Sequence, residues 1–363
     1  MKQENKSAAL NAILLLGLLY VFLMSIGLLG GSLKLFGKPL AEALISTTEH
    51  PIVGLFLGIL ATSIVQSSSM TTSLIVALVA GGMLTVENAI PMVLGANIGT
   101  TITNLLVSMA HINRSNEFRL AFAAATVHDI FNILSVLIIM PLQTATDFLG
   151  KASIEMADVF AGVGGLKMFN PLKAVTKPAI SLILDLINHS AIIGVILALV
   201  LLFLSLNYIV KLLKKVFIGK ITTLFQKYIF KTTLRSFTVG LLITVIVQSS
   251  SVTTSLIIPL AGSGILNLLQ IFPYTLGANL GTTGTAILAS LATGNVSAVA
   301  IAFAHMLFNL CGIFLFLILP LKKIPIYMAE KLAESAIKSK AIPICFIAFL
   351  FFILPLILIS IWR

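Results

Sequence analysis

The sequence predicts an all-α polytopic membrane protein in which two inverted repeats, with re-entrant hairpins and broken helices, meet at a site near the membrane midplane. Of the 363 residues, 58% are hydrophobic and only 10% are charged, whereas soluble domains carry about 25% charged residues. The hydrophobic residues form blocks long enough to cross about 30 Å of hydrocarbon as helices. A long polar motif also occurs twice. A soluble domain is therefore excluded, and the blocks are too long for the alternating strands of an outer-membrane β-barrel.

Residues 1–50 are expected to form the first transmembrane helix and a connection. The apolar block 8–30 follows Lys2 and Lys6, as in a signal peptide, but no small-x-small cleavage site and soluble region come after it. We therefore interpret the block as a membrane helix. The two cysteines, Cys311 and Cys345, lie in apolar stretches, so neither a disulfide framework nor a cysteine-rich metal site is expected.

An internal repeat organises the rest of the chain. Residues 58–103 and 240–285 align without a gap at an offset of 182, with 26 identities in 46 positions. Both copies read Gln-Ser-Ser-Ser, then Thr-Thr-Ser-Leu-Ile, then Gly-Ala-Asn-x-Gly-Thr-Thr, and His-x-x-Phe-Asn follows each copy. We expect repeat 1 to span residues 51–149 and repeat 2 to span residues 236–320.

The charges between the repeats predict their relative orientation. The stretch 211–235 holds seven Lys or Arg and no acid, which marks it as cytoplasmic. One apolar span, about 191–208, separates it from a linker of mixed charge, so the second repeat enters the membrane from the opposite side. Residues 150–235 would hold an extracellular linker, a connecting helix and a basic cytoplasmic loop. Residues 321–363 would hold a second basic cytoplasmic loop and a last span that leaves Arg363 outside.

Two short elements suggest broken helices. The stretch 51–65 is short for a membrane-spanning helix, and the block 71–84 ends at Gly81 and Gly82. Irregular backbone at membrane depth is tolerated only where it is buried in protein or lines a wet cavity. Inverted repeats with such breaks are typical of secondary transporters, whose sites lie where the repeats meet.

The repeated polar clusters are candidate ligands for an oxyanion such as phosphate. Hydroxyl groups, amide groups and helix N-termini attract an anion without the strong hold of several Arg. A single membrane Ser or Thr usually bonds back to its own helix or joins neighbouring helices, but a cluster present in both repeats favours binding. The motif glycines could serve close helix packing or a helix break. The predicted phosphate ligands are Gln66, Ser67, Ser68, Ser69, Asn97, Gln248, Ser249, Ser250, Ser251 and Asn279.

Oxygen atoms in the same motifs are hard ligands suited to Na⁺. Asp129 lies inside an apolar span, about 120–139, where an ionisable residue indicates function. Its candidate partners are a bound cation or His128, and the alternative is a structural Asp in an ion pair near the helix start. Its counterpart in repeat 2 is Met306, so any function of the carboxylate is confined to repeat 1. His128 and His305 occur in both repeats and are expected to bond between helices rather than to act as ligands. The predicted sodium ligands are Thr100, Thr103, Asp129, Asn132, Thr282, Thr285 and Asn309.

Enzymatic and nucleic-acid functions are not indicated. No hydrolytic motif, phosphate-binding glycine loop or metal-spaced His/Glu set occurs, so neither catalysis nor an organic cofactor is expected. The net charge of +11 comes from basic residues between apolar blocks, which is an orientation signal rather than a nucleic-acid surface. The expected partners are phosphate, Na⁺ and the lipid bilayer. The oligomeric state stays open, a homodimer being one option.

At the level of whole motifs, the chain resembles the type II sodium-phosphate cotransporters over about residues 50–320. The resemblance rests on the paired Gln-Ser-Ser-Ser segments, the run Gly-Ala-Asn-Ile-Gly-Thr-Thr-Ile-Thr-Asn at 95–104, and Glu-Phe-Arg-Leu-Ala-Phe at 117–122 leading into Val-His-Asp-Ile-Phe-Asn at 127–132. The segment Pro-Leu-Lys-Ala-Val-Thr-Lys-Pro at 171–178 is also similar.

The resemblance implies Na⁺-coupled uptake of inorganic phosphate, bound between the two Gln-Ser-Ser-Ser segments. It implies an extra sodium and electrogenic transport for a member with Asp129, with three Na⁺ per divalent phosphate, and a further sodium site at Asn132, Thr282 and Thr285. In that site animal members have Ser where this chain has Ala278, and Gln and Asp where it has His111 and Arg114.

The large disulfide-bearing loop of animal members and the cytoplasmic domain of some bacterial ones are absent from this sequence, which suggests a minimal bacterial member in the cytoplasmic (inner) membrane. Three alternatives stay open: an uncoupled anion channel, a phosphate sensor, and a carrier driven by protons or selective for another oxyanion. The sequence leaves open whether the repeats rock or slide during transport.

Overall fold

The computed structural model describes residues 2–225, 229–319 and 321–362, with the side chains at 2–9, 167–173, 214–225 and 229 outside the description. Every regular element within these ranges is a helix, which confirms the all-α prediction. Within these ranges, six helical segments, some of them composed of two or three consecutive elements, are long and apolar enough to cross a membrane. The pair α2 (Lys38–Thr47) and α3 (Pro51–Val65), bent by 98°, would make a seventh span.

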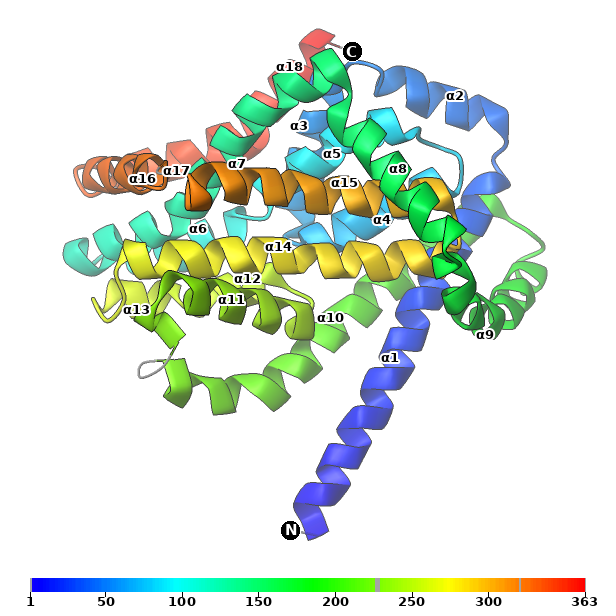
Figure 1. Ribbon diagram of the computed structural model, residues 1–363, viewed down its shortest axis with the longest axis horizontal. Coiled ribbons are helices and arrows are strands. Elements are labelled where there is room, and N and C mark those ends of the chain that lie inside the picture. The colour runs from blue at the N-terminus through cyan, green and yellow to red at the C-terminus, as the bar shows by residue number, and fades with distance from the viewer. Residues whose placement is uncertain (1, 226–228, 320, 363) are drawn as a thin grey trace.

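The helices predicted at the N-terminus and between the repeats are both present. They are α1 (Lys2–Lys34) and α10 (Ala191–Phe225), which pack against each other. Apolar stretches long enough to span a membrane cover Leu10–Lys34 and Ala191–Leu213. Only the second half of α1 is buried against other helices, and Figure 1 shows the first half projecting away from them.

Repeat 1 contains the predicted break at the Gln-Ser-Ser-Ser motif. Helix α3 ends at Val65, and α4 (Ser68–Ala80) ends just before the two glycines. Two shorter helices, α5 (Val86–Gly99) and α6 (Ile102–Met109), meet at Thr100 and Thr101, and α7 (Ser115–Thr146) completes the repeat.

Repeat 2 follows the same plan with two differences. Its elements are α11 (Thr233–Val247), α12 (Ser250–Ser255), α13 (Ile258–Gly262), α14 (Leu268–Thr293) and α15 (Val296–Ile313). The counterpart of α4 is split into α12 and α13, because Pro259 has no N–H for an internal helical hydrogen bond and favours a helix start. The counterpart of α5 and α6 is the single helix α14.

Glycines bring two helices of each repeat into backbone contact. A side-chain carbon added at Gly95 of α5 would lie 1.9 Å from the carbonyl oxygen of Leu55 in α3. A carbon added at Gly277 of α14 would lie 1.9 Å from the carbonyl oxygen of Phe237 in α11. Of the two roles considered for the motif glycines, the structure therefore shows close packing, which small residues allow in membrane helices.

The two repeats interlock. Helix α7 of repeat 1 packs against α13 and α14 of repeat 2, and α15 of repeat 2 packs against α4 and α5 of repeat 1. In Figure 1, α14 and α15 lie side by side across the middle of the molecule, with α11 and α12 beside α14. This exchange places the His-x-x-Phe-Asn segment of each repeat next to the other repeat.

The remaining helices cover the edges of this core. They are α8 (Phe148–Gly162), α9 (Gly165–Leu186), α16 (Lys323–Ala336), α17 (Ala341–Ala348) and α18 (Leu354–Trp362), with short elements η1 (Ile229–Lys231), η2 (Phe314–Ile318) and η3 (Phe349–Ile353). Helix α8 packs on α15, and α16 packs on α7. The inverted orientation and the domain boundaries stay predictions, and the placement of Arg363 lies outside the described residues.

Candidate functional site

Both Gln-Ser-Ser-Ser segments have the same backbone geometry. Gln66 has φ 57° and ψ 28°, and Gln248 has φ 57° and ψ 26°. This left-handed conformation is uncommon for a residue with a side chain. The next residue caps the following helix: Ser67 Oγ accepts a hydrogen bond from the Met70 N–H, and Ser249 Oγ does the same for Val252, each at 3.3 Å.

A cavity of about 440 Å³ lies between the two segments. Residues from both repeats line it, together with two residues of α10, and none of the lining residues is charged. The cavity therefore presents neutral hydrogen-bonding groups beside apolar walls. It is lined by Val65, Gln66, Ser67, Met70, Thr103, Val107, Asn207, Val210, Ser249, Ser251, Val252, Ser255 and Leu256.

On one side of the site, three polar residues form a closed set. The Thr285 hydroxyl donates to Oε1 of Gln248 at 2.7 Å. Ser69 Oγ, from the other repeat, lies 3.1 Å from the carbonyl oxygen of Gln248 and 3.4 Å from the Thr285 hydroxyl. These contacts tie α4 of repeat 1 to the break in repeat 2.

The residues equivalent to these three, each in the other repeat, are all described by the structure and are not hydrogen-bonded to one another. They are Gln66, Thr103 and Ser251, and all three line the cavity. Within the described residues, the buried hydroxyl of Thr103 has no hydrogen-bond partner. The same sequence motif is thus closed in one repeat and open to the cavity in the other.

Next to this site lies a buried centre of amide and imidazole groups. His128 Nε2 of α7 is 3.2 Å from Asn279 Oδ1 of α14, and His305 Nε2 of α15 is 3.2 Å from Asn97 Oδ1 of α5. Each pair joins one repeat to the other, so the expectation that these histidines bond between helices agrees with the structure. Asn97 and Asn279 do not line the cavity.

The amide group of Asn279 also links the two Asn residues of the His-x-x-Phe-Asn segments. Its Nδ2 donates to Oδ1 of Asn132 at 3.0 Å and to Oδ1 of Asn309 at 2.8 Å. Asn132 in turn donates to the backbone carbonyl of Asn97 at 3.1 Å. Two predicted phosphate ligands and two predicted sodium ligands therefore share one hydrogen-bond network.

The Asp129 carboxylate is fully buried in α7. Its Oδ1 accepts a hydrogen bond from Thr101, which lies between α5 and α6. Its Oδ2 is buried without a hydrogen-bond partner in the described part of the chain. A buried carboxylate oxygen without a partner is unfavourable, so this atom is available to a cation.

Four other predicted ligands lie outside the cavity lining. The hydroxyls of Thr100 and Thr282 donate to the carbonyls of Ala96 and Ala278, four residues earlier, at 2.9 and 3.2 Å. Ser68 and Ser250 begin α4 and α12 and are buried. These four residues lie close to the site in the chain but do not line the cavity.

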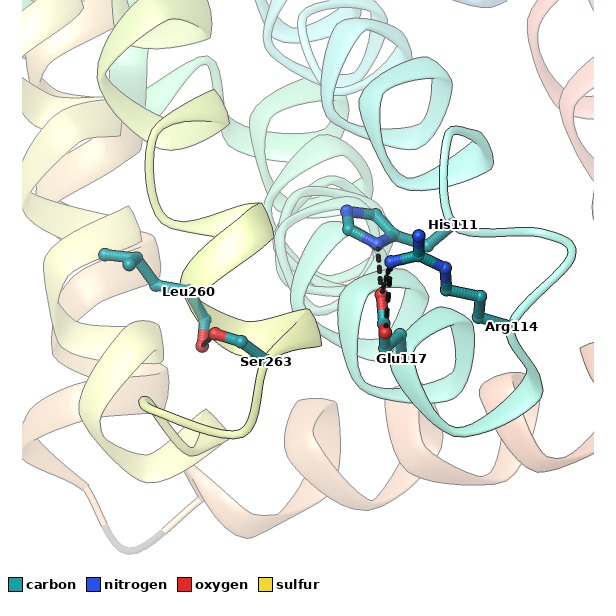
Figure 2. A network of polar contacts seen from close by, with 5 residues as sticks. All are labelled: His111, Arg114, Glu117, Leu260 and Ser263. Carbon is teal, nitrogen blue, oxygen red and sulfur yellow. Dashed lines mark hydrogen bonds and ion pairs between the residues drawn. The ribbon is translucent and has the colours of Figure 1, made fainter.

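His111 and Arg114, two positions at which the resemblance implied a different residue, lie far from Asn132. Both contact the Glu117 carboxylate at the start of α7, His111 at 3.2 Å and Arg114 at 3.1 Å. Figure 2 shows both side chains directed at Glu117, beside the turn of α13 in which Ser263 donates to the Leu260 carbonyl at 3.1 Å. Fifteen helical residues, about 22 Å, separate Glu117 from Asn132.

Sequence reasoning missed four polar residues at the site, of which Ser255, in the repeated Thr-Thr-Ser-Leu-Ile motif, lines the cavity. Thr101 contacts Asp129, and Asn104 accepts hydrogen bonds from Thr254 at 2.9 Å and Ser255 at 3.2 Å. Both belong to the motif 95–104, so the predicted ligands beside them in that motif already indicated a role at the site. Asn207 lies outside every repeated motif. The feature that could have identified it is the presence of a polar amide inside an apolar span.

Comparison with known proteins identifies relatives over nearly the whole chain. The sequence model of the family described as Na+/Pi-cotransporter matches residues 21–168 and 201–322. The chain is 34% identical to sodium-dependent phosphate transport protein 2B of Pongo abelii over 95% of its length, and 34% identical to protein 2A of Rattus norvegicus over 94%. It spans 64% and 66% of these two relatives.

The human protein 2B gives a similar result, with 33% identity over 95% of this chain and 64% of the relative. No solved structure matches. The matched ranges include both Gln-Ser-Ser-Ser segments, the amide and imidazole centre, and Asp129. The chain therefore belongs to the Na+/Pi-cotransporter family.

Proposed function

We propose that the protein is a sodium-coupled symporter that imports inorganic phosphate, with phosphate bound in the cavity between the two Gln-Ser-Ser-Ser segments. The cavity itself supports the proposal best, because uncharged polar groups from both repeats meet in it. The relatives are named sodium-dependent phosphate transport proteins, which supports the same pair of solutes. We propose the bacterial cytoplasmic membrane as the location.

Free hydrogen-bond donors in the cavity suit an oxyanion. Ser67 and Ser249 accept backbone N–H groups through their oxygens, so their hydroxyl hydrogens are left to donate to a ligand. Gln66 and Ser251 add an amide and another hydroxyl. Ser67 also caps α4, whose N-terminus attracts negative charge. Neutral donors bind an anion and also release it, as transport requires.

Sodium would occupy oxygen sites beside this cavity. The two predicted ligands with unpartnered buried oxygens in the described structure are Asp129, through Oδ2, and Thr103, through Oγ1. Thr101 positions the Asp129 carboxylate. Asn132, Asn309, Thr100, Thr282 and Thr285 remain proposed sodium ligands of the same region. A cation next to the cavity would offset the charge of phosphate, which couples the two solutes.

We further propose electrogenic transport, with three Na⁺ for each divalent phosphate. One net positive charge would then enter per cycle. A potential of 100 mV contributes about 2.3 kcal/mol to such a step, which corresponds to about 50-fold additional accumulation. The buried Asp129 is the group that would hold the additional sodium.

The test is uptake of radiolabelled phosphate by liposomes that contain the purified protein. With an inward Na⁺ gradient, we expect concentrative uptake that disappears when K⁺ replaces Na⁺ and increases with an inside-negative potential. Uptake indifferent to potential would contradict the electrogenic stoichiometry but retain the symporter. Downhill uptake without Na⁺ dependence would indicate a channel, uptake driven by a proton gradient would indicate a proton-coupled carrier, and binding without transport would indicate a sensor.

A further inference from the structure

We propose that Asn207 of α10 contacts phosphate and contributes to the selection of phosphate over oxyanions that carry no proton. This inference rests on the proposed function and adds a residue from outside both repeats. The argument depends on the position of Asn207 in the cavity, on the absence of charged residues from the cavity lining, and on the hydrogen-bonding capacity of the Asn207 amide.

Helix α10 forms a wall of the cavity through Asn207 and Val210. Gln66 and Ser67 of repeat 1 and Ser251 of repeat 2 line the same cavity. Asn207 therefore shares one cavity with polar groups of both Gln-Ser-Ser-Ser segments. An anion bound between the segments would lie beside an amide group that belongs to neither.

A structural role does not account for Asn207. An Asn in a membrane helix commonly bonds to a neighbouring helix, but Asn207 is exposed and has no hydrogen-bond partner among the described residues. Ser205, two residues earlier, shows the contrast: it is buried, and its hydroxyl donates to the Leu202 carbonyl at 3.0 Å. The amide of Asn207 is thus available to a ligand.

The chemistry of the amide fits phosphate in particular. Divalent phosphate carries one P–OH group and several negatively charged oxygens, whereas sulfate carries only acceptors at neutral pH. The Asn amide offers two N–H donors and one carbonyl acceptor. Phosphate can therefore use both ends of the amide, while sulfate leaves the carbonyl oxygen facing another acceptor, and an unpaired polar group in a binding site strongly disfavours the wrong ligand.

The same face of α10 continues to a positive charge. Lys211 is four residues after Asn207 and so lies on the same side of the helix, about 6 Å further along the axis. Its ammonium group is 5.3 Å from the centre of the Tyr208 ring. Asn207 thus lies about one helical turn before the first basic residue of α10, whose positive charge favours an anion near this end of the helix.

The test compares Asn207→Leu and Asn207→Asp with wild type in the liposome assay. Leucine is well tolerated in membrane helices and removes the amide, so the phosphate KM should rise about tenfold while inhibition by sulfate stays the same. Aspartate should raise the KM further at alkaline pH, where phosphate is divalent. Matched controls are Ser205→Ala in α10 and Asn113→Asp, which adds the same charge outside the cavity, where Asn113 accepts a hydrogen bond from Lys340.

Stabilisation by Na⁺ in a thermal melt checks folding independently of phosphate, and it should be unchanged in the Asn207 variants. Wild-type uptake with an unaltered phosphate KM in both variants would overturn the role of Asn207 and leave the proposed function intact. An equal KM increase in Asn113→Asp would also overturn it, as a long-range charge effect. Absence of Na⁺-dependent phosphate uptake by the wild type would overturn the proposed function and this inference with it.

Discussion

The Thr285 hydroxyl donates to Oε1 of Gln248 at 2.7 Å, whereas Thr103, the residue at the equivalent position of repeat 1, has no partner in the described structure and faces the cavity with Gln66. Near-identical motifs therefore adopt two states within one chain. Only one of the two sets is closed by hydrogen bonds, so substitutions at equivalent positions of the two repeats should have different effects.

The first prediction uses this difference. Thr285→Val removes the donor to Gln248 and should destabilise the protein by about 0.5–2 kcal/mol. Thr103→Val replaces an unpartnered buried hydroxyl with a methyl group of similar shape, so the melting temperature should stay the same or rise while phosphate uptake falls. Thermal melting in detergent, with uptake measured on the same preparations, gives both values. Equal destabilisation by the two substitutions would contradict the asymmetry.

The histidine and asparagine pairs should behave as two equivalent links between the repeats. His128→Ala leaves Oδ1 of Asn279 without its imidazole partner, and His305→Ala does the same to Asn97. Each double-mutant cycle should give a coupling energy of about 0.6–1.7 kcal/mol, the range of hydrogen bonds between membrane helices. Thermal stability in detergent is the readout. His128 with Asn113, which precedes α7 and accepts a hydrogen bond from Lys340 outside this network, is the control pair and should be additive.

Neutralising Asp129 should uncouple current from transport. In Asp129→Gly, the loss of the carboxylate should remove one coupled Na⁺ and the transport current, while some phosphate uptake remains. Solid-supported membrane electrophysiology measures the current, and flux assays count Na⁺ per phosphate. Asp158→Asn, which removes an exposed acid from α8, should leave both unchanged. A normal current in Asp129→Gly would rule out the role assigned to this carboxylate.

Alanine at the packing glycines should separate α3 from α5 and α11 from α14. The added carbon at Gly95 or Gly277 would lie 1.9 Å from a backbone oxygen, so we expect destabilisation of about 1–3 kcal/mol from overpacking. Gly284→Ala, also in α14, meets its nearest atom at 3.8 Å and should be neutral or stabilising by up to about 1 kcal/mol. Similar melting temperatures for Gly277→Ala and Gly284→Ala would contradict the close contact.

The helices themselves could be predicted from the sequence. The apolar blocks determined the membrane spans, since a helix of about 20 apolar residues is the structure that satisfies its own backbone in lipid. The offset of 182 predicted that α3 and α11 correspond, and the structure places Pro51–Val65 and Thr233–Val247 at that offset. The breaks at Gln66 and Gln248 followed from the same repeat.

The sequence by itself also determined the polar inventory of the site and the family to which the chain belongs, because motif residues and their spacing are local properties. Only the tertiary structure decided how these residues divide into a cavity, a closed set and a buried amide and imidazole centre. That division depends on contacts between segments that are 150 to 210 residues apart, such as His128 with Asn279 and His305 with Asn97. The division also depends on α10, which brings Asn207 to the cavity although no repeated motif contains Asn207. Local spacing sets which face of a helix a residue occupies, but the packing of separate helices sets what that face meets.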